Sequence, residues 1–189
     1  GTYTVGSGGN YPSLTNTGGI FEAINLSGAT GNVTIQIISN LTGELGTHAL
    51  NEIAGGFSTL IYPCGNPISI TGSNTGALIR LNGADNVTIF GDSVLCNPPL
   101  VGGDAARRHL TIQNTNTGLA ASVILIASSG ANGAQNNLIQ HVNVLGQDPT
   151  TTLYGISLGG ATPGSIATGP NNDNKVINNS IKRAHIGVY

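Results

Sequence analysis

The stretch Ala77-Leu-Ile-Arg-Leu-Asn-Gly-Ala-Asp-Asn-Val-Thr-Ile89 decides the fold of this 189-residue chain. Two short aliphatic and β-branched runs, Leu78–Leu81 and Val87–Phe90, flank a turn made of Asn, Gly, Ala and Asp. Asn, Gly and Asp tolerate the left-handed backbone that a tight corner needs. Because units of this kind recur as far as the C-terminus, the pattern predicts a solenoid in which strands stack coil upon coil.

The composition favours a closely stacked β architecture. Charged residues make up only 7% of the chain, against roughly 25% in an ordinary soluble domain. The net charge of −2 gives no electrostatic reason to bind nucleic acid or an anionic membrane surface. No apolar run approaches the roughly 20 residues that span a bilayer, so we expect no membrane span. We expect no cofactor, because the Gly-rich segment 6–10 lacks the Lys and Ser/Thr of a phosphate-binding loop.

The sequence predicts an all-β fold with one short helix near its start. Residues 1–19 should form the strand Thr2–Val5 and a loop. The segment Ile20–Ser27 has the apolar spacing of an amphipathic helix, which Gly28 ends. Such a helix would cover the open end of the solenoid core. The coils should occupy residues 28–189, so that 1–189 forms a single domain.

Strands are expected wherever short apolar runs alternate with polar residues. In Val33–Ser39, the side chains of Val33, Ile35 and Ile37 should face inward. The other main expected strands are Thr59–Tyr62, Ile68–Thr71, Leu110–Gln113, Val123–Ala127, Leu138–Val144, Tyr154–Leu158, Val176–Ile181 and Ile186–Tyr189. A jelly roll or sandwich is the main alternative, but it needs hairpin turns at a regular spacing of about 8–12 residues.

Three segments superpose as a degenerate repeat, and they begin at Leu110, Leu138 and Val176. Each precedes a second apolar run, which begins at Val123, Tyr154 and His185. In a right-handed parallel β-helix, the strands of one coil pair with those of the coils above and below. Corner asparagines would then form amide ladders. The candidates are Asn82, Asn114, Asn143 and Asn179.

The cysteines and the sequons leave alternatives open. Cys64 and Cys96 form one disulfide in an oxidising compartment, or they are two independent buried thiols. Five Asn-x-Ser/Thr sequons count as glycosylation sites only if the source organism has the machinery. They begin at Asn25, Asn32, Asn40, Asn86 and Asn178.

Three parts of the sequence together resemble a known family. They are Gly1–Gly6 with Tyr11–Thr15, Leu78–Ile89, and Leu110–Thr117. These parts are similar to large secreted surface proteins of Bacteroidetes-type bacteria, which have right-handed β-helix regions of the pectin-lyase-like superfamily. The resemblance covers most of the chain. It implies an extracellular location, often within a long multidomain protein, and for most members of the family it implies no defined activity.

Because pectin-lyase-like folds include polysaccharide lyases and glycoside hydrolases, an enzyme is the alternative function. The densest polar cluster is Asp104, Arg107, Arg108 and His109, in which Arg107 would be a base or a substrate clamp. We favour a solvated loop instead, because hydrolysis needs two carboxylates at a fixed separation and the eight Asp and Glu residues are scattered. The four histidines are isolated, so no metal site is expected.

Flat polar or aromatic surfaces suggest two further binding roles. Tyr62, Tyr154 and Tyr189 are the candidates for a glycan platform, although tyrosine is sparse in this chain. The numerous threonines lack the strict Thr-x-Thr repeat of an ice-binding face.

We therefore expect a non-catalytic, secreted structural or adhesive module of the cell surface that assembles end to end into a filament. Its expected partners are copies of itself or adjoining domains of a longer chain, with surface glycans as a further class. A detached N-terminal strand would add to a neighbour's sheet, and an uncapped C-terminal strand would offer a bare edge. The residues of these assembly surfaces are Thr2, Tyr3, Thr4, Val5, Ile186, Val188 and Tyr189. A chain that ends in a strand is expected to be a fragment or to meet another subunit.

Overall fold

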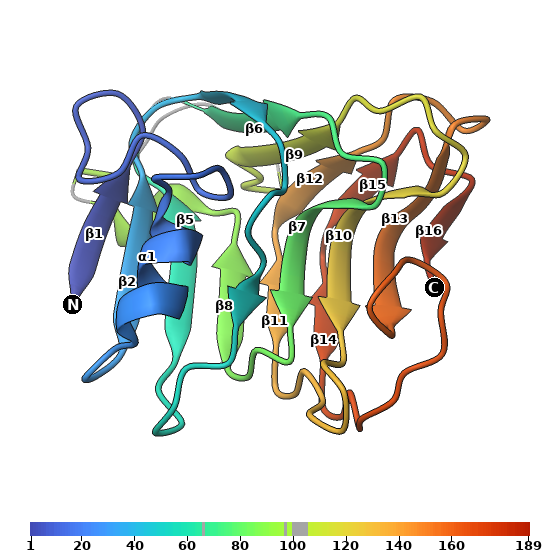
Figure 1. Ribbon diagram of the computed structural model, residues 1–189. Coiled ribbons are helices and arrows are strands. Elements are labelled where there is room, and N and C mark those ends of the chain that lie inside the picture. Colours follow the sequence, from blue (N-terminus) through green and yellow to red (C-terminus); the bar gives the residue numbers. More distant parts are fainter. Residues whose placement is uncertain (66, 97, 100–105) are drawn as a thin grey trace.

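The chain is built mostly of short parallel strands. A computed structural model describes residues 1–65, 67–96, 98–99 and 106–189, and its strands form three sheets (Figure 1). Every ladder between the named strands is parallel. The jelly-roll alternative is therefore wrong, because it requires antiparallel hairpins.

The strands visit the three sheets in a repeating order. The first sheet contains, in spatial order, β1 (Thr2–Val5), β2 (Val33–Ile37), β5 (Thr59–Pro63), β8 (Val87–Phe90), β11 (Leu138–Gln140) and β14 (Lys175–Ile177). The second contains β3 (Leu41–Glu44), β6 (Ile68–Gly72), β9 (Leu110–Asn114), β12 (Val142–Leu145) and β15 (Ser180–Lys182). The third contains β4 (Leu50–Asn51), β7 (Ala77–Asn82), β10 (Ala121–Ala127), β13 (Thr152–Gly159) and β16 (Ile186–Val188). We call each set of three consecutive strands from β2 onward a coil, so β2–β4 is the first coil and β14–β16 the last.

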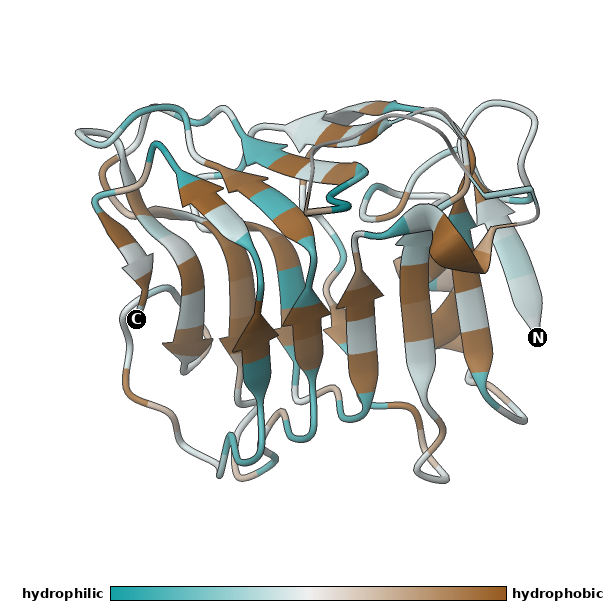
Figure 2. Ribbon diagram, turned by 180° about the vertical axis from the view of Figure 1, so that it is seen from behind, coloured by the Kyte–Doolittle hydropathy of each residue, from teal (hydrophilic) through white to brown (hydrophobic). Residues whose placement is uncertain are grey.

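The core lies between the three sheets and consists of apolar side chains in register. In the first sheet, Ile35, Ile61, Ile89 and Ile139 form one continuous row, and each is at most 1% exposed. Equivalent rows in the other sheets contain Ile70, Ile112 and Val144, and Ile79, Ile124 and Ile156. Figure 2 shows these rows as brown bands that recur in neighbouring strands. Burying one such side chain contributes about 1.5–3 kcal/mol, so the stacked rows hold the coils together.

The predicted inward orientation of Val33, Ile35 and Ile37 is confirmed. The predicted repeat that begins at Leu110, Leu138 and Val176 does not match the observed strand register. Leu138 pairs with Thr88 in the first sheet, whereas Leu110 pairs with Val142 in the second. The error arose because Leu138–Val144 is not one strand but two, β11 and β12. His141 turns the corner between them with a left-handed φ of 59°. Likewise, Asn178 (φ 50°) divides the predicted strand Val176–Ile181 into β14 and β15.

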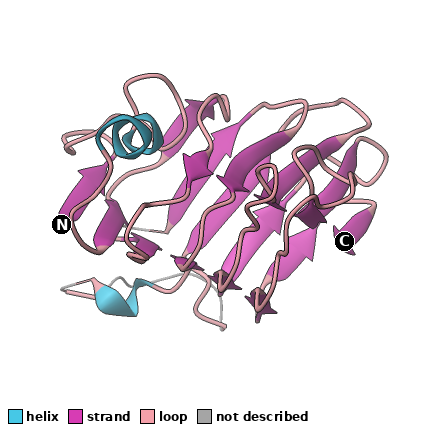
Figure 3. Cartoon of the chain, turned by 60° about the horizontal axis from the view of Figure 1, so that its bottom comes forward, coloured by secondary structure: helices cyan, strands magenta, loops and turns pink. Residues whose placement is uncertain are grey.

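Helix α1 (Ile20–Ser27) is confirmed, and Ile20, Phe21 and Ile24 are its buried residues. Figure 3 shows it at the N-terminal end of the sheets. The helix also closes the third sheet, because Asn25 pairs with the edge strand β4. Its Nδ2 donates to the carbonyl of Ala49 (2.7 Å), and its Oδ1 accepts the N–H of Asn51 (3.0 Å).

Asparagines also bond to backbone groups at the other two sheet edges at the N-terminal end. Asn16 donates to the carbonyl of Gly43 (3.0 Å) and accepts the N–H of Leu45 (2.7 Å) at the edge of the second sheet. At the first sheet, Asn10 Oδ1 accepts the N–H of Thr4 (2.8 Å), and Tyr11 N–H donates to the Thr4 carbonyl (3.1 Å). The prediction of a detached N-terminal strand is wrong, because β1 is hydrogen-bonded to β2 on one side, and its Thr4 is bonded to Asn10 and Tyr11 on the other.

The amide ladder predicted for four asparagines is not observed. Asn82 contacts another amide, that of Asn51 (2.9 Å). Asn114 and Asn179 bond to backbone groups of other coils instead, and Asn143 donates to the carbonyl of Arg108.

Of the two alternatives for the cysteines, the disulfide is the one observed. Cys64 and Cys96 are bonded, with their Cα atoms 5.3 Å apart.

Candidate functional site at the corner between the first two sheets

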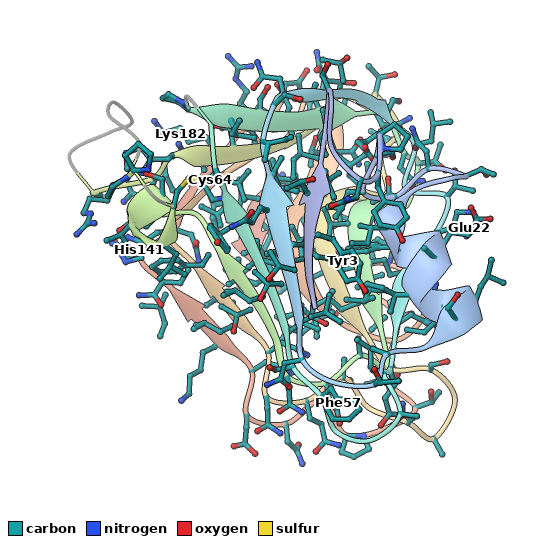
Figure 4. All side chains as sticks on the ribbon, turned by 90° about the vertical axis from the view of Figure 1, so that its left-hand side faces the viewer. Tyr3, Glu22, Phe57, Cys64, His141 and Lys182 are labelled. Carbon is teal, nitrogen blue, oxygen red and sulfur yellow. A yellow bond between two sulfur atoms is a disulfide. The ribbon has the colours of Figure 1, made fainter. Side chains whose placement is uncertain are left out.

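A polar cluster that includes the predicted candidates Arg107 and His109 lies at the corner where the first sheet passes into the second. Gly91 follows β8 and His141 follows β11, and Gly91 N–H donates to the Gln140 carbonyl (2.8 Å). Figure 4 looks from the N-terminal end and places Cys64 and His141 on the same side of the molecule, away from α1. Stacked corners therefore bring together residues that are far apart in sequence.

Asp92 is the centre of this cluster and is 3% exposed. Its Oδ2 lies 2.9 Å from Nε of Arg107, and its Oδ1 lies 3.6 Å from Nδ1 of the buried His109. Oδ1 also accepts the N–H of Val94 (3.0 Å), which caps the short 3₁₀ helix η1 (Ser93–Leu95). The carboxylate thus holds the start of η1 and the segment before β9 together.

Ser93, His109 and Asp92 include the residue types of a nucleophilic triad, but their geometry does not match one. Ser93 Oγ lies 3.2 Å from Nδ1 of His109, and Ser93 N–H points at the same nitrogen (3.3 Å). A relay needs the serine and the carboxylate on opposite ring nitrogens. Here Ser93 and Asp92 both approach Nδ1, so these three residues do not form such a relay among themselves.

The predicted catalytic candidates that the structure describes contact other parts of the fold. Arg107 Nε pairs with the buried carboxylate of Asp92. Arg108 spans two coils, with Nε donating to the carbonyl of Asn178 (3.1 Å). Asp104 lies outside the described residues. Sequence reasoning did not select Asp92, because the separation of 15 positions from Arg107 concealed their pairing.

Two of the three tyrosines proposed for a glycan platform are not accessible. Tyr62 is 5% exposed, and its hydroxyl accepts a hydrogen bond from Nε2 of Gln36 (2.6 Å). Tyr154 is 7% exposed and stacks against Tyr189, with the ring centroids 4.6 Å apart. The prediction for Tyr62 and Tyr154 is therefore wrong, because a sugar-binding platform needs an open ring face.

Metal ligands are not grouped in the part of the chain that the structure describes. Across residues 1–65, 67–96, 98–99 and 106–189, no three or more His, Cys, Asp or Glu side chains are placed to hold a metal ion. Among the same residues, no helix is long and apolar enough to cross a membrane.

Two open hollows lie on the sides of the coil stack. One, of about 420 Å³, lies between loops that precede strands of the third sheet, and its lining includes Leu119, Thr150 and His185. The other, of about 450 Å³, lies where strands of the first sheet begin, and Asn136 and Asp173 are among its lining residues.

We call the outer side of the last coil the open end, because no strand of the described chain covers it. Strands β14, β15 and β16 are the final strands of their sheets, and their core residues Val176, Ile181 and Ile186 are only half-buried. Of the predicted C-terminal assembly residues, Val188 is 47% and Tyr189 is 53% exposed.

Comparison of the chain with protein-family models, curated proteins and solved structures gives no match. The geometry of the chain itself therefore carries the functional argument.

Proposed function

We propose that the chain is a non-catalytic, extracellular structural module, a right-handed parallel β-helix closed at one end and open at the other. The fixed order in which strands enter the three sheets supports a continuous coil. A right-handed path is the general rule for connections between parallel strands of one sheet. The disulfide supports an oxidising, secreted environment, as does the resemblance to secreted surface proteins.

The contrast between the two ends carries this proposal. Asn10, Asn16 and Asn25 satisfy backbone groups at the N-terminal edges. At the last coil, three strand edges and the half-buried Val176 and Ile181 have no comparable cover within the described chain. Unpaired edges with apolar neighbours favour the addition of another β layer. We propose that a second copy or an adjoining domain supplies it.

The charge distribution favours a head-to-tail arrangement of two copies. Residues 1–79 contain the solvent-accessible Glu22 and Glu52 and neither Lys nor Arg, whereas residues 173–189 contain Lys175, Lys182 and Arg183 and one Asp. If two open ends met, like charges would face each other across the contact. If an open end met the N-terminal end of another copy, unlike charges would face each other. Because Asn10, Asn16 and Asn25 occupy backbone groups at the N-terminal edges, side chains rather than continuous strand pairing would make that contact, and repetition would give a filament.

Sedimentation velocity at increasing concentration and low salt tests the proposal. We expect association that weakens in high salt, and loss of association in Lys182→Glu/Arg183→Glu. The matched control, Asn116→Glu/Thr117→Glu on the side of the stack, should associate normally. A chain that shows no concentration dependence at any salt would contradict the self-assembly version.

The enzyme alternative is tested separately. We expect no depolymerisation of a broad polysaccharide panel, measured as new reducing ends or unsaturated products. Turnover that Asp92→Asn or Arg107→Ala abolishes would overturn the non-catalytic assignment.

A further inference from the structure

The 450 Å³ hollow beside the first sheet, which we call the polar hollow, has features of a binding site. Its lining residues are Thr88, Asn136, Asn137, Leu138, Asp173 and Lys175. They come from three consecutive coils and surround the point where β8, β11 and β14 begin.

Strand register arranges these residues in two rows. Thr88, Leu138 and Lys175 occupy equivalent positions in neighbouring strands. Two residues earlier, Asn136 and Asp173 have left-handed φ values of 56° and 57° at equivalent corners. Neighbouring strands lie about 4.8 Å apart, so each row repeats its side chains at that interval along the stack.

Most of the polar groups in the hollow are not used by the fold. Asn137 is the exception: it is 1% exposed and bonds to the backbone of Val87 and Ala84. Within the described part of the chain, the side chains of Thr88, Asn136, Asp173 and Lys175 make no hydrogen bond or ion pair with other protein groups. The hollow therefore presents a hydroxyl, an amide, a carboxylate and an ammonium group beside the half-buried Leu138.

We propose that the polar hollow binds a neutral, hydroxyl-rich ligand, namely a short stretch of a glycan chain. A sugar hydroxyl both donates and accepts hydrogen bonds, and these side chains offer donors and acceptors side by side. The charges of Asp173 and Lys175 cancel, which favours a neutral ligand. Leu138 supplies an apolar surface for the C–H face of a sugar ring. This site would give the proposed structural module an adhesive function that does not depend on its assembly.

Other ligand classes fit the polar hollow less well. Nucleic acid requires several cations along its backbone, and Lys175 is the only Lys or Arg among the lining residues. A calcium ion takes six to eight oxygen ligands, usually including several carboxylates, and Asp173 is the only carboxylate in the lining.

The test uses NMR chemical-shift titration of the intact chain with a panel of neutral oligosaccharides. Asn136→Gly removes the amide, and glycine tolerates the left-handed backbone that the corner requires. Asn86→Gly is the matched control, because Asn86 has the same left-handed conformation (φ 57°) one coil earlier and does not line the hollow. We expect saturable shifts in residues around the hollow, a Kd at least tenfold weaker in Asn136→Gly, and an unchanged Kd in Asn86→Gly.

Three outcomes would overturn the proposal. They are the absence of saturable shifts across the panel, equal weakening in both glycine variants, and saturation of the same residues by Ca²⁺ alone. Asp173→Asn distinguishes the last outcome further, because it would abolish binding of a cation but retain part of the hydrogen-bonding capacity for a sugar. These outcomes are separate from the sedimentation result, so either proposal can fail alone.

Discussion

The side-chain oxygen of Asn174, just before the last coil begins, accepts the backbone N–H of Asn137, at the start of the preceding coil, at 3.0 Å. Asn137 makes the same kind of contact with the coil that precedes its own. It accepts the N–H of Val87 at 2.8 Å and donates to the carbonyl of Ala84 at 2.9 Å. Each asparagine therefore satisfies backbone groups at a corner where the ladder of the first sheet has not yet begun. The coils are joined there by amide-to-backbone bonds rather than by an amide ladder.

Replacing Asn137 should destabilise the chain substantially. Asn137→Ala removes two hydrogen bonds and leaves the buried Val87 N–H and Ala84 carbonyl unsatisfied, which costs about 2–4 kcal/mol. Asn174→Ala is the matched comparison, because Asn174 is only half-buried and should cost less. Urea denaturation measures both free energies of unfolding, and equal effects would contradict this account of the corner.

Glu44 should anchor the N-terminal segment to the coils. It is 2% exposed, and its carboxylate accepts hydrogen bonds from Ser13 Oγ, the N–H groups of Leu14 and Thr15, and Thr15 Oγ1. Glu44→Gln directs an NH₂ group at these donors, so we expect a loss of about 2–4 kcal/mol in urea denaturation. The exposed Glu52→Gln is the control and should change stability by less than about 0.5 kcal/mol. A neutral effect of Glu44→Gln would show that the segment does not depend on this carboxylate.

The disulfide should stabilise the chain by fastening η1 beside β5. It joins residues 32 positions apart, and a cross-link of this length contributes about 2–4 kcal/mol. A reducing agent should therefore lower the midpoint of thermal unfolding, and Cys64→Ala/Cys96→Ala should unfold at a similarly lowered midpoint whether or not reductant is present. If the double variant remains sensitive to reductant, the cause of the shift is not this bond.

Asp148 gives a pH-dependent prediction. The hydrogen bond from the Thr150 hydroxyl (2.6 Å), followed by that from the Thr150 N–H (2.7 Å), lowers the pKa of the Asp148 carboxyl. A carboxyl whose pKa is lower in the folded state adds stability above its unfolded pKa and loses it as pH falls through the folded pKa. NMR titration should place the Asp148 midpoint below the ordinary range, and Thr150→Ala should move it upward. An unchanged midpoint in that variant would contradict the assigned cause.

Sequence patterns predicted the fold better than the site. The alternation in Val33–Ile37 and the apolar spacing of Ile20–Ser27 identified a strand and the helix because local side-chain periodicity fixes both. The corners at His141 and Asn178 were missed because a left-handed residue other than glycine gives little local signal.

The site contacts depend on strand register, which no short stretch of sequence reveals. Asp92 meets Arg107, and Arg108 reaches Asn178, only because corners of different coils stack. Tyr62 appeared available for the same reason, since its neighbour Gln36 belongs to the preceding coil. Knowledge of the register would have been needed to exclude it as a sugar platform.

Amide hydrogen exchange, measured strand by strand at several protein concentrations, tests the open end most directly. We expect β14–β16 to exchange faster than β11–β13 in dilute solution, because the preceding coil has neighbours on both sides and the last coil has one. Exchange in β14–β16 should slow as concentration rises and another molecule covers the open end. Equal protection of the two coils in dilute solution would contradict the proposal that the last coil is an open interaction surface.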